Sequence, residues 1–174
     1  MPRKPLSKQE EVSDSVNLLV SILVRYPQIA SVNLDPVARR LKFSFLVSGS
    51  ISPGQVTALE EDLLNRLALF HELEGGSFNP PSLAASRLEG LTMLEAWFGV
   101  AGLSQGEISL FIGTLQDKLG DQLVADRNDG VMEEDLLVQE ELIDHILANV
   151  KPSSLRNKNI IAFREEGKVH VFNK

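Results

Sequence analysis

The sequence predicts an α+β domain, in which an antiparallel sheet is built from β-hairpins and the helices pack mainly on one face of the sheet. Two patterns carry this prediction. Four segments place apolar residues at helical spacing, and three segments alternate apolar and polar residues around turn-forming residues. The segments follow one another in the order α-ββ-α-ββ-α-α-ββ along the 174 residues, which is long enough to bury a core.

The first predicted helix and the first predicted hairpin lie between residues 12 and 45. Residues 12–25 carry apolar side chains at helical spacing, and Pro27 ends this helix because it pushes the preceding residue out of the α region. Residues 32–45 then alternate on both sides of Asp35 and the proline after it. An Asp-Pro pair favours a turn, so two strands joined at Asp35 are expected.

The second and third predicted helices resemble each other. Residues 52–67 read "SPGQVTALEEDLLNRL", and residues 104–119 read "SQGEISLFIGTLQDKL". Both place apolar residues at positions 5, 8, 12 and 16 of the segment, which forms one stripe along a helix. The likeness predicts two amphipathic helices, each with a serine N-cap.

Both helices have the start signal of a capping box. Ser52 and Ser104 are the expected N-caps, and three residues later Gln55 and Glu107 supply the side chain that bonds back to the cap. Local hydrogen bonding alone therefore explains why each serine is there.

An internal duplication of a hairpin followed by a helix is a hypothesis for residues 31–67 and 85–119. The alternative is that two capped amphipathic helices look alike because capping and burial demand the same residue types. Residues 83–98 are the weak point, since "SLAASRLEGLTMLEAWF" is also rich in helix formers. A helix there would exclude the duplication.

The chain is expected to hold one domain at residues 11–174, after a flexible arm at residues 1–10. The segment "GGSFNPPS" at residues 75–82 is a loop, because glycine and proline break regular structure. If the chain holds two domains, this loop is the expected linker.

The last two predicted elements are a helix at residues 136–150 and a hairpin at residues 160–172 that turns at Gly167. The hairpin is too apolar to stand alone in water, so we expect it on the main sheet or against a second subunit. Its apolar side chains are Ile161, Phe163, Val169, Val171 and Phe172.

The net charge of −7 is unevenly spread. Residues 151–174 hold six basic and two acidic residues, which leaves 11 basic and 22 acidic residues in the rest of the chain. An acidic body does not attract nucleic acid, so any RNA binding is expected to be weak and to use the basic C-terminal hairpin. Alternatively, the basic end packs beside the acidic stretch at residues 107–144 and offsets its charge.

The candidate contacts for an anion or a ligand are Ser52, Gly54, Ser104 and Gly106. They lie at the two helix starts, where backbone amides can cradle an anion. The chain has neither a P-loop nor a dinucleotide-binding glycine motif, and capping alone explains both serines. No cofactor is expected.

No catalytic or metal-ligating constellation is recognisable. The three histidines, His71, His145 and His170, are expected on three separate elements, and the chain has no cysteine. The apolar run at residues 16–24 is well short of the ~20 residues that a membrane span needs. The absence of cysteine suits a cytoplasmic protein.

Two further features allow a binding role or a structural one. Trp97 and Phe98 could anchor a partner or stack on a base, although such residues more often lie in a core. Arg39 and Arg40 could touch a phosphate, although an exposed charged turn is the commoner role.

The leading hypothesis is a non-catalytic cytoplasmic module for protein interaction or regulation that self-associates or binds a protein partner. The first alternative is an RNA- or ribosome-associated domain. The second alternative is a small-molecule-binding domain or an enzyme with its site at the two glycine-containing helix starts.

Overall fold

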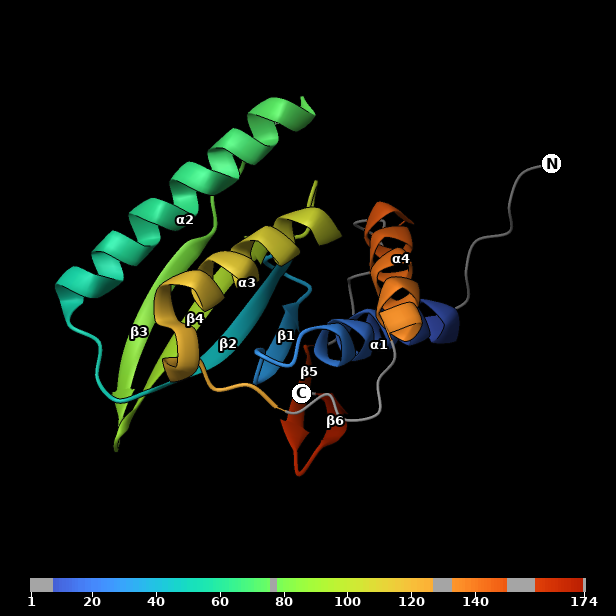
Figure 1. Cartoon of the computed structure of the whole chain (residues 1–174). Helices are drawn as coiled ribbons and strands as arrows, with labels where there is room; N and C mark the ends of the chain where they lie inside the picture. The colour runs from blue at the N-terminus through green and yellow to red at the C-terminus, as the bar shows by residue number, and fades with distance from the viewer. Residues whose placement is uncertain (1–7, 76–77, 127–132, 150–158, 174) are drawn as a thin grey trace.

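Six strands form a single antiparallel sheet in the order β3-β4-β2-β1-β5-β6, and the helices lie on one side of it (Figure 1). The computed structural model describes residues 8–75, 78–126, 133–149 and 159–173. The helices are α1 (Lys8–Arg25), α2 (Pro53–Glu74), α3 (Gln105–Leu119) and α4 (Glu133–Asn149), with a short 3-10 turn η1 (Gly120–Gln122). The strands are β1 (Ser31–Asp35), β2 (Arg40–Ser48), β3 (Ser82–Leu88), β4 (Leu91–Gly99), β5 (Ile160–Glu165) and β6 (Lys168–Asn173). The predicted fold class and element order are confirmed.

The sheet is made of three hairpins, β1-β2, β3-β4 and β5-β6. The first two hairpins join through β2 and β4, which pair along their whole length from Arg40 opposite Gly99 to Ser48 opposite Leu91. The last hairpin joins through β5, which pairs with β1. The prediction that the C-terminal hairpin lies on the main sheet is therefore confirmed.

Residues 83–98 are strands, and the alternative of a helix there is wrong. Every second residue of β4 is buried, from Thr92 to Phe98, which is the period of a strand with one face on a core. Tertiary packing has overridden the local helix propensity. Both candidate repeats are thus a hairpin followed by a helix, β1-β2-α2 and β3-β4-α3, as the duplication hypothesis requires (Figure 1).

The hydrophobic core lies between the sheet and the helices. The sheet contributes buried apolar side chains from one face of its strands: Val32, Leu34, Leu41, Phe43, Phe45, Val47, Leu94, Ala96, Phe98, Ile160 and Ala162. Helix α3 crosses the middle of this face, where the ring of Phe111 lies 5.0 Å from that of Phe98 and 5.9 Å from that of Phe45. Phe98 is therefore a core residue.

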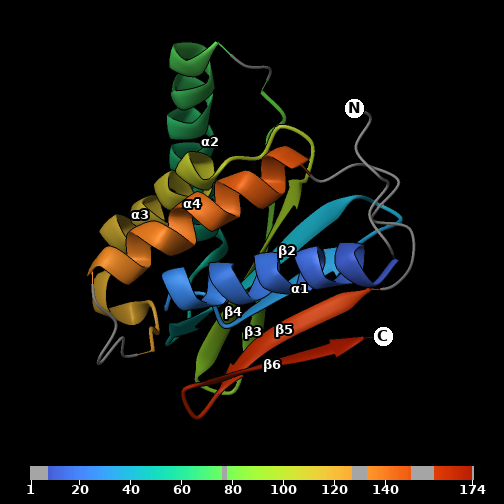
Figure 2. The same cartoon turned by 90° about the vertical axis from the view of Figure 1, so that its right-hand side faces the viewer.

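Helix α1 packs over β1 and β5, and α4 packs on α1 (Figure 2). Arg164 of β5 fixes the end of α1, because its guanidinium donates hydrogen bonds to the backbone carbonyls of Leu23 and Tyr26. Its Nε lies 3.6 Å from a carboxylate oxygen of Asp126, and burial lowers the pKa of Arg164. This arginine of the C-terminal hairpin is therefore committed to the fold.

Several predicted features border or fall on residues outside the described part of the chain. The expected arm covers residues 1–10. Residues 8–10 belong to helix α1, which begins at Lys8, and residues 1–7 lie outside the described part of the chain. Within the loop at residues 75–82, residues 76–77 are not described. Strand β2, which precedes this loop, and β4, which follows it, pair in one sheet. Four of the six basic residues of the C-terminal patch, at positions 151, 156, 158 and 174, are also outside. Among the described helices, none has the length and apolarity to cross a membrane.

Candidate functional site

The predicted contact at the start of α3 is already used by the chain itself. The backbone N–H of Glu107 donates to Oγ of Ser104 at 3.2 Å, so Ser104 is the N-cap as predicted. The N–H of Gln105, the first residue of α3, donates to a carboxylate oxygen of Asp144 in α4 at 2.9 Å. An internal carboxylate thus occupies the place where an external anion was expected.

Gly106 has a packing role. A Cβ added to it would lie 3.1 Å from the ring of Phe70, so the missing side chain lets the start of α3 approach α2 closely. At the start of α3, the N–H groups of Gln105 and Glu107 thus already have acceptors within the chain.

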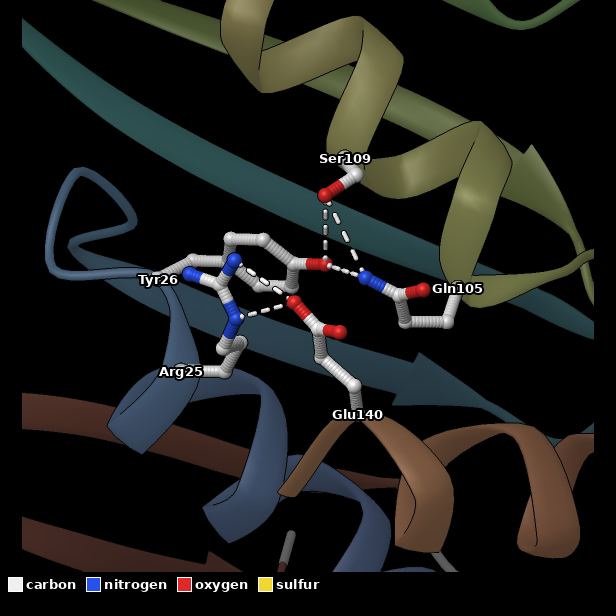
Figure 3. A network of polar contacts seen from close by, with 5 residues as sticks. All are labelled: Arg25, Tyr26, Gln105, Ser109 and Glu140. Atoms are coloured by element: carbon white, nitrogen blue, oxygen red, sulfur yellow. Dashed lines mark hydrogen bonds and ion pairs between the residues drawn. The ribbon is translucent and has the colours of Figure 1, made fainter. Parts of the chain in front are cut away.

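A partly buried polar network surrounds the same helix start, with the buried Tyr26 at its centre (Figure 3). The amide Nε2 of Gln105 donates to the hydroxyl of Tyr26 at 2.6 Å, and that hydroxyl lies 3.2 Å from Oγ of Ser109. Nearby, Arg25 forms an ion pair of 2.6 Å with Glu140 and its guanidinium lies 4.8 Å above the Tyr26 ring. Burial raises the pKa of Tyr26, and the side chains of α1, α3 and α4 satisfy one another. The network holds three helices together.

The capping box predicted for Ser104 and Glu107 is only half right. The Glu107 carboxylate turns away from the cap and lies 3.2 Å from Nε2 of His71 in α2. Both side chains are buried, and the His71 ring is flanked by the rings of Phe70 and Phe78 at 5.6 and 5.3 Å. Burial raises the pKa of Glu107, while its contact with His71 acts in the opposite direction. The carboxylate makes this contact because α2 packs against α3.

The start of α2 carries a complete capping box. The N–H of Gln55 donates to Oγ of Ser52 at 3.2 Å, and the N–H of Ser52 donates to Oε1 of Gln55 at 2.9 Å. Gly54 is exposed, and Ser52 borders an open groove of about 760 Å³ between α2 and β3. Helices α2 and α3 run in opposite directions, since Asp62 pairs with Lys118 and Phe70 lies beside Gly106. The structure therefore does not bring the four candidate residues into one site.

The face of the sheet away from the helices carries many apolar side chains. Register puts them on the side opposite to the core: Leu46, Leu88, Leu91, Met93, Trp97, Ile161, Phe163 and Phe172. We call this surface the open face, because no helix of the described chain covers it (Figures 1 and 2). Leu88 and Phe172 are 46% and 54% exposed, and the other six side chains are partly exposed.

The β5-β6 end of the open face is aromatic. The ring centroids of Phe163 and Phe172 are 5.4 Å apart and the rings are stacked. The ring of His170, which lies directly opposite Phe163 on β6, also stacks on Phe163, at 5.5 Å. Val169 and Val171 point to the opposite side and pack against the core. The apolar residues of this hairpin are thus divided between the core and the open face.

The middle of the open face is polar and electrically balanced. Lys42 pairs with Glu95 at 3.0 Å, and Oδ1 of the neighbouring Asn33 is buried without a hydrogen-bond partner. The charged residues that register assigns to this face are three basic and three acidic: Arg40, Lys42, Lys168, Asp35, Glu95 and Glu165. The face is therefore neutral on a chain whose net charge is −7.

A second groove of about 570 Å³ lies at the end of the sheet where β2 begins. It is lined by Arg39, Arg40 and Trp97 among others, so the aromatic residue and the arginines that the sequence singled out separately meet here. Neither arginine has an ion pair among the described residues.

The three histidines lie on α2, α4 and β6, as predicted. In the part of the chain that the structure describes, no three His, Asp or Glu side chains are grouped to hold a metal ion. Comparison with family models, with curated proteins and with solved structures gave no match to this chain.

Sequence reasoning did not identify the open face, although a signal was present. Leu91, Met93 and Trp97 alternate with the buried residues of β4, so this strand is apolar on both sides. A strand at the surface of a two-layer fold normally has one polar side. Apolar residues at both the odd and the even positions of a strand could have indicated a second contact surface.

Proposed function

We propose that this protein is a non-catalytic, cytoplasmic protein-interaction module that self-associates through the open face of its sheet. The observation that carries the proposal is the two groups of partly exposed apolar side chains on that face, one on β2, β3 and β4 and the other on β5 and β6, where Phe172 is 54% exposed beside Phe163. Soluble monomers rarely expose large apolar patches, and such patches commonly mark interaction sites.

The size and shape of the open face suit a second sheet. Strands ~4.8 Å apart with ~3.3 Å per residue give six strands of about seven residues a surface of roughly 650 Å². Stable interfaces bury about 800 Å² on each partner, so most of a dimer interface can be accommodated here. Two twisted sheets pack face to face at ~10 Å when their side chains interdigitate.

The charge of the open face favours a second copy over a nucleic acid. Two chains of net charge −7 repel each other, and they can meet most easily where the surface is neutral. The Lys42–Glu95 pair at the centre offers both signs of charge to a symmetric partner.

The test is the oligomeric state, measured by light scattering after gel filtration from about 5 to about 100 µM protein. We expect a species of twice the 19.2 kDa chain mass at the higher concentrations. Phe172→Glu should shift the protein to the monomer. At concentrations where the wild type is also monomeric, the two should melt at the same temperature, because this side chain is 54% exposed in the folded chain.

Leu73→Glu is the matched control. Leu73 is 78% exposed on α2 and does not belong to the open face, so this variant should remain dimeric. A wild-type protein that is monomeric throughout the concentration range would contradict self-association, as would a Phe172→Glu variant that is as dimeric as the wild type.

RNA binding is the second candidate, and the groove beside Trp97 favours it. Arg39 and Arg40 could contact phosphates while the indole stacks on a base. Against this candidate, Arg164 of the C-terminal hairpin is occupied by the carbonyls of Leu23 and Tyr26. The same hairpin also carries two glutamates.

A further inference from the structure

Strand β3 is an edge strand with an unprotected outer side. Within the described ranges it pairs with β4 on one side and with no strand on the other, and six of its seven residues are exposed. Proteins usually protect such edges with charged residues, prolines or bulges. Residues 82–86 of β3 are small or apolar and uncharged, and the nearest prolines precede the strand. The outer backbone groups of β3 are therefore accessible to another strand.

A groove runs beside this edge on the helix side of the sheet. Leu83, Ala85 and Arg87 face this side, because they pair with Ala96, Leu94 and Thr92 of β4, which are buried there. The groove has a volume of about 760 Å³ and is walled on the other side by the start of α2, including Val56. Ala85 is exposed although it faces the helix layer, so a larger side chain can fit above it.

The charge in the groove is positive. Among the described residues that line it, Arg87 alone is charged, and it makes no ion pair with any of the residues that the structure describes. The start of α2 adds the positive end of a helix dipole on the same side. A ligand that places one carboxylate next to the guanidinium of Arg87 would complement the charge of the groove.

We propose that β3 and the groove bind an extended segment of another protein, which adds to the sheet as a seventh strand. The segment pairs antiparallel with β3 and directs every second side chain into the groove. It places an acidic side chain opposite Arg87, a large apolar one opposite Ala85 and a smaller apolar one opposite Leu83. Read along the segment, these three side chains are separated by one residue each.

A second copy of this chain fits the edge less well. Strand β3 contains no carboxylate, so two β3 strands paired with each other would leave Arg87 without an acidic partner. Antiparallel pairing about Ala85 would put Leu83 opposite Arg87. This site is separate from the open face, and it does not depend on self-association.

The test uses two fluorescein-labelled nonapeptides with the full-length protein and measures fluorescence anisotropy. The first peptide carries glutamate, leucine and valine at alternate positions, with threonine between them, and the second carries lysine in place of glutamate. We expect the glutamate peptide to bind roughly tenfold more tightly, because opposite charges across a strand pair attract and like charges repel. Failure of both peptides to bind at about 1 mM would overturn the proposal.

Two variants then locate the site. Arg87→Glu should reverse the preference, so that the lysine peptide binds more tightly. Lys168→Glu is the matched control, since Lys168 is also an exposed basic residue on an edge strand, but on β6 at the other end of the sheet. This control should keep the preference of the wild type. An unchanged preference in Arg87→Glu would place the peptide elsewhere and overturn the proposal.

Backbone methylation tests whether the peptide adds as a strand. In a strand at an edge, alternate N–H groups point to the neighbouring strand and the others point to solvent. Of two peptides N-methylated at alternate sets of positions, one should lose binding and the other should keep it. Equal effects of the two sets would show that the peptide does not pair along β3. Because the open-face variant Phe172→Glu should bind the glutamate peptide like the wild type, failure of self-association is distinguishable from failure of this site.

Discussion

In the buried pair of Glu107 and His71, the Glu107 side chain contacts a residue of another helix and does not complete the local capping box. Ser104 caps α3 through the backbone N–H of Glu107, which depends only on neighbouring residues and was predictable. The destination of the Glu107 carboxylate was not, because His71 lies on α2 and reaches it only after α2 has packed against α3. Sequence patterns identify caps well because caps are local, and they miss partners that packing supplies.

The pair gives a prediction for the pH dependence of stability. Burial raises the pKa of Glu107 above its ordinary value of 4.5, so the folded protein binds this proton more readily than the unfolded chain does. The resulting stabilisation is complete below the unfolded pKa and is lost as the pH rises through the folded pKa. Glu107→Gln cannot titrate. The free energy of unfolding of the wild type relative to Glu107→Gln should therefore increase as the pH falls from about 7.5 to about 4.5.

Urea denaturation at a series of pH values measures this difference. Asp62→Asn is the control of opposite sign, since a hydrogen bond from Lys118 lowers the pKa of Asp62 at the surface. The wild type relative to that variant should lose stability as the pH falls through the folded pKa of Asp62. A difference between wild type and Glu107→Gln that is independent of pH would mean that burial does not shift this carboxyl.

At the scale of elements, strands were harder to predict than helices. The two capped helices follow from local capping and an apolar stripe, and both are present. Residues 83–98 contain strong helix formers, and they become strands because β4 pairs with β2 and β3 pairs with β4. Helix propensity is a property of the segment, whereas strand pairing depends on a distant segment.

The C-terminal hairpin offers a test with two adjacent and identical residues. Ile160 is 4% exposed and faces the core, whereas Ile161 is partly exposed on the open face. Ile160→Ala should lower the free energy of unfolding by about 2–5 kcal/mol, because it removes buried methyl groups and leaves a cavity. Ile161→Ala should cost less than half as much in the monomer. Chemical denaturation of both variants measures the contrast.

Equal losses for the two variants would contradict the register of β5 on β1. They would also remove the distinction between the covered and open faces on which the proposed self-association rests. If Ile161→Ala weakens the dimer while Ile160→Ala lowers the stability of the monomer, the two faces have separate roles.

For the whole molecule, the sheet order and the side that the helices cover could not be predicted from the sequence. The pattern of β4 allows either set of alternate residues to face the core, since both sets contain large apolar side chains. The choice is made by α3, whose Phe111 packs against Phe98 and Phe45. The open face and the β3 edge therefore emerge only when all six strands are assembled.

Net charge acts at the same scale and gives the prediction for nucleic acid. The chain carries −7 overall, and the phosphates of RNA are repelled by its acidic body. Single-stranded RNA should bind more weakly than about 10 µM at physiological salt, with an affinity that falls steeply as salt increases. Fluorescence anisotropy with a labelled oligonucleotide at several salt concentrations measures both quantities.

Charge reversal at the arginines separates a specific groove from general attraction. If the groove beside Trp97 holds RNA, the double variant Arg39→Glu and Arg40→Glu should reduce the residual affinity more than Lys168→Glu does, because only the arginines line that groove. If all these reversals reduce affinity in proportion to the charge removed, the binding is non-specific. Submicromolar binding of the wild type that persists at physiological salt would contradict the prediction, because bulk repulsion would then have been overcome by specific contacts. RNA would in that case replace a second protein chain as the preferred partner.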